Sequence, residues 1–207
     1  MKPDDLDWGE RILDSTGALA LEEIPQRLTF LGGGVIGTEL AGLYSRLGSD
    51  VTIIEAGESI LQDFSPDLVK LVARQIAKDG VEVITGAELK DVAAEDQQLH
   101  LTYEKEGQKM NLVSDYLALT MGRRPNTVSL NLQAAGIETD NQGFIPVDDQ
   151  GRTSRRPIFA IGDVVAGPAL AHKASYEAKV ASAVTRMLLW IIGPCRKWST
   201  VSRKLRR

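Results

Sequence analysis

A cluster of glycines with an acidic residue downstream is the feature of this sequence most suited to nucleotide chemistry. Gly32, Gly34 and Gly37 form the spacing G-x-G-x-x-G after the apolar run 28–31, and Glu55 follows the next apolar run. In a dinucleotide site the first glycine allows a tight turn, the second lets a pyrophosphate approach the backbone, and the third lets a helix pack closely. The helix also presents free N–H groups to the phosphates. A purely structural turn is the alternative, but the order of strand, loop, helix, strand and acid favours a dinucleotide site.

Glu55 indicates which nicotinamide nucleotide this loop binds. It lies 18 residues after Gly37, at the predicted end of the second strand. A carboxylate there accepts hydrogen bonds from ribose hydroxyls and repels a 2′-phosphate. No Lys or Arg lies between Glu55 and Asp63 to receive that phosphate. We therefore expect NAD rather than NADP.

A second candidate motif lies near residue 160. The apolar run Ile158–Ile161 is followed by Gly162 and Asp163. By itself a Gly-Asp pair is as typical of an ordinary turn as of a binding site. Its position between a predicted strand and a predicted helix from Ala171 favours a binding site.

The elements that would position these motifs follow from the spacing of apolar residues. Short apolar runs predict buried strands, and apolar residues at helical spacing predict helices between them. The expected strands are 28–31, 51–54 and 81–84, and the expected helices are 35–47 and a segment around 68–76. This alternation is typical of an α/β fold, a Rossmann-like NAD-binding domain with a parallel sheet.

The pattern then changes from parallel to antiparallel. Three alternating segments predict an antiparallel β-meander, namely 90–94, 99–103 and 110–113. Residues 116–120 are expected to return to the parallel sheet. Residues 1–26 are expected to be irregular, 158–161 to form another buried strand, and 171–183 to form a helix.

Composition limits the classes of function. The chain has 24 Lys and Arg against 28 Asp and Glu, and it contains no apolar run long enough to cross a membrane. Residues 1–185 hold all 28 acidic residues and 17 of the basic ones, a net charge of −11 that argues against nucleic-acid binding. No apolar signal-peptide core is present, and one cysteine excludes an internal disulfide. We expect a cytoplasmic protein with no metal site, no nucleic-acid partner and no membrane contact.

Three ordered motifs resemble the flavin-dependent pyridine-nucleotide disulfide oxidoreductases. They are Gly32–Glu39, Met121–Asn126, and Ile158–Asp163 with Pro168–Lys173. Within that family, Ile12–Leu19 and Leu170–Glu177 are most similar to the dihydrolipoamide dehydrogenase group. The resemblance runs from about Arg11 to Ala183. It implies that NAD and FAD are both cofactors, with NAD taking hydride from reduced flavin.

The resemblance also implies a role for each matching residue. Gly32–Ile36 would contact the NAD pyrophosphate and Glu55 the adenosine ribose, while Gly122 and Arg123 would lie on the nicotinamide side. Asp163 would hydrogen-bond the ribitol or pyrophosphate region of FAD, and Ala171 would touch the flavin ring through its backbone. Glu39, expected on the first turn of its helix, resembles the acid that pairs with a lysine beside the flavin. The predicted cofactor residues are Gly32, Gly33, Gly34, Val35, Ile36, Gly37, Glu39, Glu55, Gly122, Arg123, Asp163 and Ala171.

Two of these roles have plain structural alternatives. Glu39 is equally suited to complementing the dipole of the helix. Arg123 and Arg124 also fit a solvated pair in a loop, the interpretation that we favour for Arg124. Both alternatives stay open at the level of the sequence.

The sequence holds only part of what the family's complete enzyme needs. The resemblance implies an N-terminal glycine fingerprint for FAD, two cysteines separated by four residues, and a C-terminal interface domain with a His-Glu base. This sequence has one fingerprint, one cysteine and no such pair near its end. Because thiol–disulfide exchange needs a thiolate and a disulfide, no catalytic residue is assigned. The expected domains are the end of a first FAD segment (1–24), the NAD-binding domain (25–145) and a return segment of the FAD domain (146–185).

Residues 186–207 differ sharply from the rest of the chain. They hold seven Lys or Arg, no Asp or Glu, and Cys195. If the reading frame is shifted by one base, codons that are allowed for residues 190–206 can encode a segment that resembles the start of the family's interface domain. We hypothesise that this atypical basic tail is a frameshifted product. A genuine basic segment that binds a membrane or a partner is the alternative.

The resemblance implies the activity of the intact relative. It would oxidise dihydrolipoamide, pass electrons through FAD to NAD, and serve 2-oxo acid dehydrogenase complexes as a homodimer. We expect this chain, the central portion of such an enzyme, to have low or no activity alone. The alternatives are another flavin disulfide reductase, such as a mercuric reductase or an NADH oxidase, and a stand-alone NAD-binding module or inert fragment.

Overall fold

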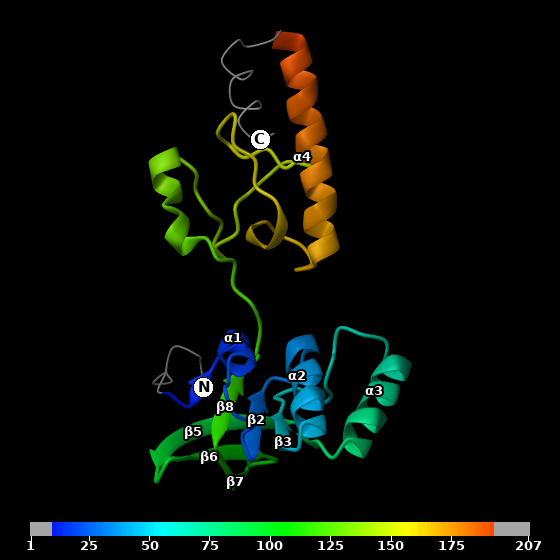
Figure 1. Cartoon of the computed structure of the whole chain (residues 1–207), viewed down its shortest axis with the longest axis vertical. Coiled ribbons are helices and arrows are strands. Elements are labelled where there is room, and N and C mark those ends of the chain that lie inside the picture. Colours follow the sequence, from blue (N-terminus) through cyan, green and yellow to red (C-terminus); the bar gives the residue numbers. More distant parts are fainter. Residues whose placement is uncertain (1–9, 193–207) are drawn as a thin grey trace. The chain divides into compact units, whose positions relative to one another are not determined.

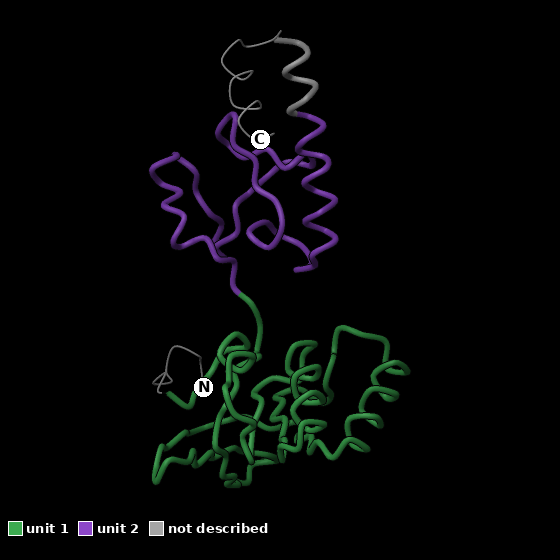
Figure 2. The backbone as a smooth tube through the Cα atoms, in the orientation of Figure 1, with its two compact units in different colours: residues 1–123 green, residues 124–207 purple. Residues whose placement is uncertain are grey.

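The computed structural model describes residues 10–192, with side chains described as far as Val184. The chain forms two compact units, residues 1–123 and 124–207, which are taken one at a time below (Figure 2). Residues 193–207 of the predicted frameshifted tail lie outside the described residues, so that hypothesis stays a prediction. None of the helices in the described part combines the length and the apolar character that a bilayer crossing requires.

The first unit is built on a five-stranded parallel sheet. Its strands are β1 (Ile12–Leu13), β2 (Arg27–Leu31), β3 (Asp50–Ile54), β4 (Glu82–Ile84) and β8 (Tyr116–Leu119). Their order across the sheet is β1-β8-β2-β3-β4, and every neighbouring pair is parallel. In the central register Phe30 of β2 lies between Ala118 of β8 and Ile53 of β3. The predicted parallel α/β sheet is confirmed.

Helices cover one face of this sheet, and they are α1 (Ser15–Leu19), α2 (Val35–Arg46) and α3 (Pro66–Lys78) (Figure 1). Leu28 and Phe30 of β2 face them and are almost fully buried. Burying side chains of this size contributes roughly 1.5–3 kcal/mol each. Tyr44 of α2 donates its hydroxyl to the carbonyl oxygen of Ala18, which ties α2 to α1. Burial raises the pKa of the Tyr44 hydroxyl above its ordinary value.

The predicted meander covers the opposite face. It consists of β5 (Ala87–Glu95), β6 (Gln98–Lys105) and β7 (Gln108–Ser114), paired antiparallel in that order. Leu99, Leu101 and Tyr103 of β6 pack with Leu31 and Leu117 of the parallel sheet. Because side chains alternate across a strand, neighbouring residues of β2 feed the two separate cores.

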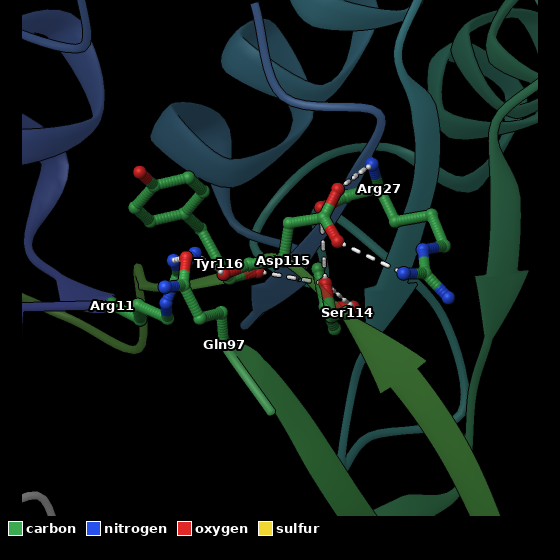
Figure 3. A network of polar contacts seen from close by, with 7 residues as sticks. Arg11, Arg27, Gln97, Ser114, Asp115 and Tyr116 are labelled. Carbon is green, nitrogen blue, oxygen red and sulfur yellow. Dashed lines mark hydrogen bonds and ion pairs between the residues drawn. The ribbon is translucent and has the colours of Figure 1, made fainter. Parts of the chain in front are cut away.

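Polar side chains tie together the ends at which β2 and β8 begin (Figure 3). Asp115 accepts hydrogen bonds from the backbone N–H of Arg27 at 2.8 Å and from its Nη2 at 3.0 Å. Arg11 Nη1 donates to the carbonyl oxygen of Asp115 at 3.3 Å, and its guanidinium lies 5.3 Å from the ring centroid of Tyr116. Ser114 Oγ donates to the carbonyl oxygen of Tyr116 at 2.8 Å. These side-chain contacts therefore link the first residues of β2 and β8 at the amino edge of the sheet.

The second unit has less regular structure. Its described elements are the 3₁₀ turns η2 (Val128–Leu130), η3 (Leu132–Ala135) and η4 (Gly162–Val164), and the helix α4 (Ala171–Ile192). A small apolar core gathers Ile137, Ile145, Ala160 and Val165. Residues 124–145 group with this unit, whereas the sequence places the end of the NAD-binding domain at 145. That functional boundary stays a prediction.

Two expectations about local structure were wrong. Residues 1–26 are not wholly irregular, because β1 pairs with β8 and α1 begins after Asp14, whose Oδ1 accepts a hydrogen bond from Gly17 N–H at 2.7 Å. Residues 158–161 do not form a strand; Phe159 makes only an isolated bridge to Arg152. A strand persists when a neighbouring strand accepts its backbone hydrogen bonds, and within 124–192 the described residues offer only this bridge.

Candidate functional site

The glycine loop lies at the point where the order of strand addition in the parallel sheet reverses. From β2 the chain adds β3 and β4 on one side, whereas β8 is added on the other side. In open parallel sheets, ligands bind outside the carboxyl ends of the strands at such a switch point. The loops that follow β2 and β8 both leave the sheet here, at residues 32–34 and 120–122.

The three glycines of the fingerprint have different surroundings. Gly32 has a φ of 106°, and a Cβ on it would lie 2.9 Å from the backbone nitrogen of Met121. A Cβ on Gly37 would collide with the carbonyl oxygen of Gly32 and lie 2.7 Å from Thr120 Oγ1. A Cβ on Gly34, in contrast, would meet nothing within 4 Å. The first and third glycines therefore serve close backbone packing, and the second leaves open space beside the backbone.

Gly33 is fixed by the segment that follows β3. Its N–H donates to Glu55 Oε2 at 2.6 Å, and its carbonyl oxygen accepts from Leu61 N–H at 2.9 Å. Glu55 Oε1 accepts from Gly57 N–H at 2.7 Å and from Gln62 Nε2 at 3.3 Å. A carboxylate has about four lone-pair sites, so these three contacts leave capacity for a further donor such as a ribose hydroxyl.

Two threonines hold the loop from its other sides. Thr120 Oγ1 lies 3.1 Å from the carbonyl oxygen of Leu31 and 2.9 Å from that of Gly32. Thr38 Oγ1 donates to the carbonyl oxygen of Gly34 at 2.6 Å. Neither threonine was among the site residues predicted from the sequence. The available signals were a threonine as the last residue of the predicted strand segment 116–120 and another near the start of the predicted helix, but threonine at such positions is not specific to a binding loop.

The start of α2 faces the open space beside Gly34. Its first backbone N–H groups, at Val35, Ile36 and Gly37, have no carbonyl four residues earlier within the helix, and Val35 is exposed. Glu39 is exposed and is the fifth residue of α2, so the expectation that it lies on the first turn was wrong. Because a helix dipole acts within the first turn, this position weakens the dipole interpretation of Glu39.

Gly122 and Arg123 follow β8 at the carboxyl edge and are exposed. Gly122 has a φ of 137°, and a Cβ on it would meet nothing within 4 Å. This conformation strongly favours glycine. The structure thus brings the loop after β8 to the same edge of the sheet as the glycine fingerprint, where a dinucleotide lying across the switch point would reach both.

The two predicted flavin residues lie in the second unit. Asp163 is exposed within η4, directly after Gly162, whose φ of 77° again favours glycine. Ala171 is exposed and begins α4, which packs against η4. A carboxylate and a helix N-terminus are both groups that can bind polar parts of a cofactor.

The first unit thus brings together N–H groups at a helix start, a glycine with open space beside it and a carboxylate beyond the next strand, which are the features that a dinucleotide site requires. The family model described as pyridine nucleotide-disulphide oxidoreductase matches residues 4–178. The chain belongs to this family. The resemblance that the sequence motifs predicted is confirmed.

Curated relatives are similar to most of the chain. A dihydrolipoyl dehydrogenase of Geobacillus stearothermophilus is 48% identical over 175 residues, and one of Bacillus subtilis is 46% identical over 176 residues. Each match covers 84% of this chain but 37% of the relative. The chain therefore spans a little over a third of the length of these curated relatives.

Solved structures of similar proteins share the fold. The HOCl-induced flavoprotein disulfide reductase RclA of Escherichia coli superposes with a TM-score of 0.74 at 33% identity, over 81% of this chain and 38% of that one. LpdA of Mycobacterium tuberculosis gives 0.75 at 27% identity, over 87% and 39%. The predicted Rossmann-like fold of a flavoprotein reductase is confirmed.

Proposed function

We propose that the first unit binds NAD across the carboxyl edge of its parallel sheet. The pyrophosphate would lie against Gly34, Val35 and Ile36, where the first turn of α2 provides N–H groups and positive potential. The observation that carries this proposal is the open space at Gly34 between two glycines that have none. Gly122 and Arg123 would contact the nicotinamide side of the same molecule.

Glu55 would bind the adenosine ribose. Its carboxylate already orients the loop through Gly33 and keeps lone-pair capacity for a hydroxyl. A 2′-phosphate would meet this negative charge, and residues 55–63 contain no Lys or Arg to receive it. We therefore propose that the site binds NAD more tightly than NADP.

We further propose that the second unit contributes part of an FAD site. Asp163 would hydrogen-bond the ribitol or pyrophosphate region, and the backbone of Ala171 would contact the flavin ring. Exposed Glu39 would pair with a lysine near the flavin. When bound, the flavin supplies an electron carrier between a dithiol and the nicotinamide, while the residues named here bind and orient it.

For the whole protein we propose oxidation of dihydrolipoamide with NAD as acceptor, as a cytoplasmic homodimer within 2-oxo acid dehydrogenase complexes. The names of the relatives and their 45–48% identity support this proposal. The present sequence holds one cysteine, so it is assigned the cofactor steps and not thiol–disulfide exchange. Its expected turnover alone is low or absent.

The test is a comparison of NAD and NADP affinities in the full chain by calorimetry. Glu55→Gln removes the charge and replaces one of two acceptor oxygens by an NH2 group, so the contact to Gly33 or to Gly57 is lost as well. We expect NAD affinity to fall about tenfold or more, since a hydrogen bond to a charged group contributes roughly 1.5–3 kcal/mol. The preference for NAD over NADP should narrow as well. Glu58→Gln is the matched control, because Glu58 is an exposed acid three residues away; it should leave both affinities unchanged.

Two outcomes would contradict parts of the proposal. A Glu55→Gln variant with the parent's preference between NAD and NADP would overturn the ribose assignment. NAD binding without flavin retention, and without NADH formation from dihydrolipoamide, would identify the chain as a stand-alone NAD-binding module.

A further inference from the structure

Two side chains of α4 hold the turn that carries Asp163. Glu177 Oε2 accepts a hydrogen bond from Gly162 N–H at 2.7 Å, and Lys173 Nζ donates to the carbonyl oxygen of Gly162 at 3.0 Å. Lys173 Nζ also lies 3.1 Å from Glu177 Oε1, one helical turn away. The ammonium, the carboxylate and the two backbone groups of Gly162 therefore form a closed ring.

The ring fixes two successive peptide groups. The N–H belongs to the peptide before Gly162, and the carbonyl belongs to the peptide that joins Gly162 to Asp163. Within the turn, the Gly162 carbonyl oxygen also accepts a hydrogen bond from Val165 N–H at 3.2 Å. Because glycine is the residue with the most backbone freedom, the ring adds a restraint on both sides of Gly162 that this single backbone bond does not supply. The side chains of Lys173 and Glu177 are 16% and 26% exposed, and hydrogen bonds to charged groups are stronger when partly shielded from water.

The neighbouring glycines leave room for the ring. A Cβ on Gly167 would lie 3.0 Å from Lys173 Cε, and one on Gly162 would lie 3.3 Å from the Cβ of Ala174. Both glycines have positive φ values, 119° and 77°. The segment 162–167 thus packs closely against the aliphatic part of the Lys173 side chain and also accepts a hydrogen bond from its ammonium group.

We propose that Lys173 and Glu177 are positioning residues for the flavin. They hold Asp163 in a fixed relation to the first turn of α4, where Ala171 lies, so that a carboxylate and a helix start meet the same cofactor. This inference rests on the FAD site proposed above. The turn is ordered before the ligand arrives, which lowers the entropic cost of binding.

The test uses the full chain and two readouts. FAD affinity is measured by flavin fluorescence up to millimolar ligand, and hydrogen exchange at the Gly162 amide is measured by NMR. We expect Lys173→Met to weaken FAD binding about tenfold and to speed exchange at Gly162. Lys173→Arg should restore most of both. Combining Lys173→Met with Glu177→Gln should cost less than the sum of the two, because both act on one ring.

Lys179→Met is the matched control, since Lys179 is exposed on the same helix; it should change neither readout. Lys173→Met with the parent's FAD affinity, or with unchanged exchange at Gly162, would overturn the proposal. A parent chain that binds NAD but no FAD at millimolar concentration would overturn it too, while leaving the NAD proposal standing. If Glu55→Gln left NAD affinity unchanged while Lys173→Met still weakened FAD binding, the NAD proposal would be overturned and this inference would stand.

Discussion

The two candidate cofactor sites are held in different ways. The glycine loop of the first unit continues from a central strand, and Gly33 is fixed through Glu55 and Leu61. The turn at Gly162 in the second unit is held by side chains of one helix, beside a small core. The glycine loop is held by close backbone packing as well as by side chains, whereas the turn at Gly162 combines one internal backbone hydrogen bond, from Val165 N–H, with the side chains of Lys173 and Glu177.

The largest expected effect is Gly37→Ala, because its Cβ would collide with the backbone of Gly32. Overpacking of this kind costs typically about 1–3 kcal/mol. We expect about 3 kcal/mol in the free energy of unfolding, because the two obstacles, the Gly32 carbonyl oxygen and Thr120 Oγ1, are hydrogen-bonded to each other. NAD affinity should fall at least about 100-fold, since the loop must move. Denaturant unfolding and NAD calorimetry measure the two effects.

Gly42→Ala is the matched control on the same helix. A Cβ on Gly42 would meet only Arg46 Nη2, at 3.7 Å, and alanine is favoured over glycine in helices by up to about 1 kcal/mol. We expect equal or greater stability and unchanged NAD affinity. Equal losses at positions 37 and 42 would contradict the close-packing argument.

Gly34→Ala should separate binding from stability. A Cβ there meets no protein atom within 4 Å, and the φ of −72° is allowed for alanine. We expect an unchanged melting temperature and NAD binding about tenfold weaker or worse, because the methyl group would occupy the path of the pyrophosphate. A variant that is less stable but binds NAD normally would reverse this interpretation.

The smallest expected effect concerns a turn of the second unit. Backbone hydrogen bonds from Arg152 and then Gln150 hold the pKa of Asp148 below its ordinary value. A lowered folded pKa contributes stability that is present above the unfolded value and is lost as pH falls through the folded one. Amide shifts of Gln150 and Arg152 should therefore move only in acid, below the ordinary range for Asp. Asp148→Asn should abolish that transition; its persistence would assign it to another group.

The order of elements in the first unit was predictable because its signals are local. Apolar runs and helical spacing indicated β2, α2, β3, α3 and β4, and the glycine spacing indicated the loop. The proposed roles of Gly32, Gly34 and Gly37 come from that spacing, and their different surroundings in the structure agree with the proposal. In this part of the chain, the elements that the local sequence pattern predicts are the ones that the packed structure contains.

The parts that were missed depend on contacts between distant residues. The two-residue strand β1 exists because Ile12 and Leu13 pair with Leu117 and Ala118, and a two-residue run has no readable period. The ring around Gly162 joins residues 11 and 15 positions apart. The apolar run 158–161 predicted a buried strand, but Ile158 is 37% exposed and the backbone of this run makes only the isolated bridge between Phe159 and Arg152.

The most direct test of the central claim is an NMR titration of the full chain with NAD. We predict that the amides of Gly34, Val35 and Ile36 shift most, that the shifts saturate, and that Gly34→Ala loses them at the same NAD concentrations. Shifts concentrated away from the glycine loop, or the same saturating response in Gly34→Ala, would contradict the assignment of the NAD site to the carboxyl edge of the parallel sheet.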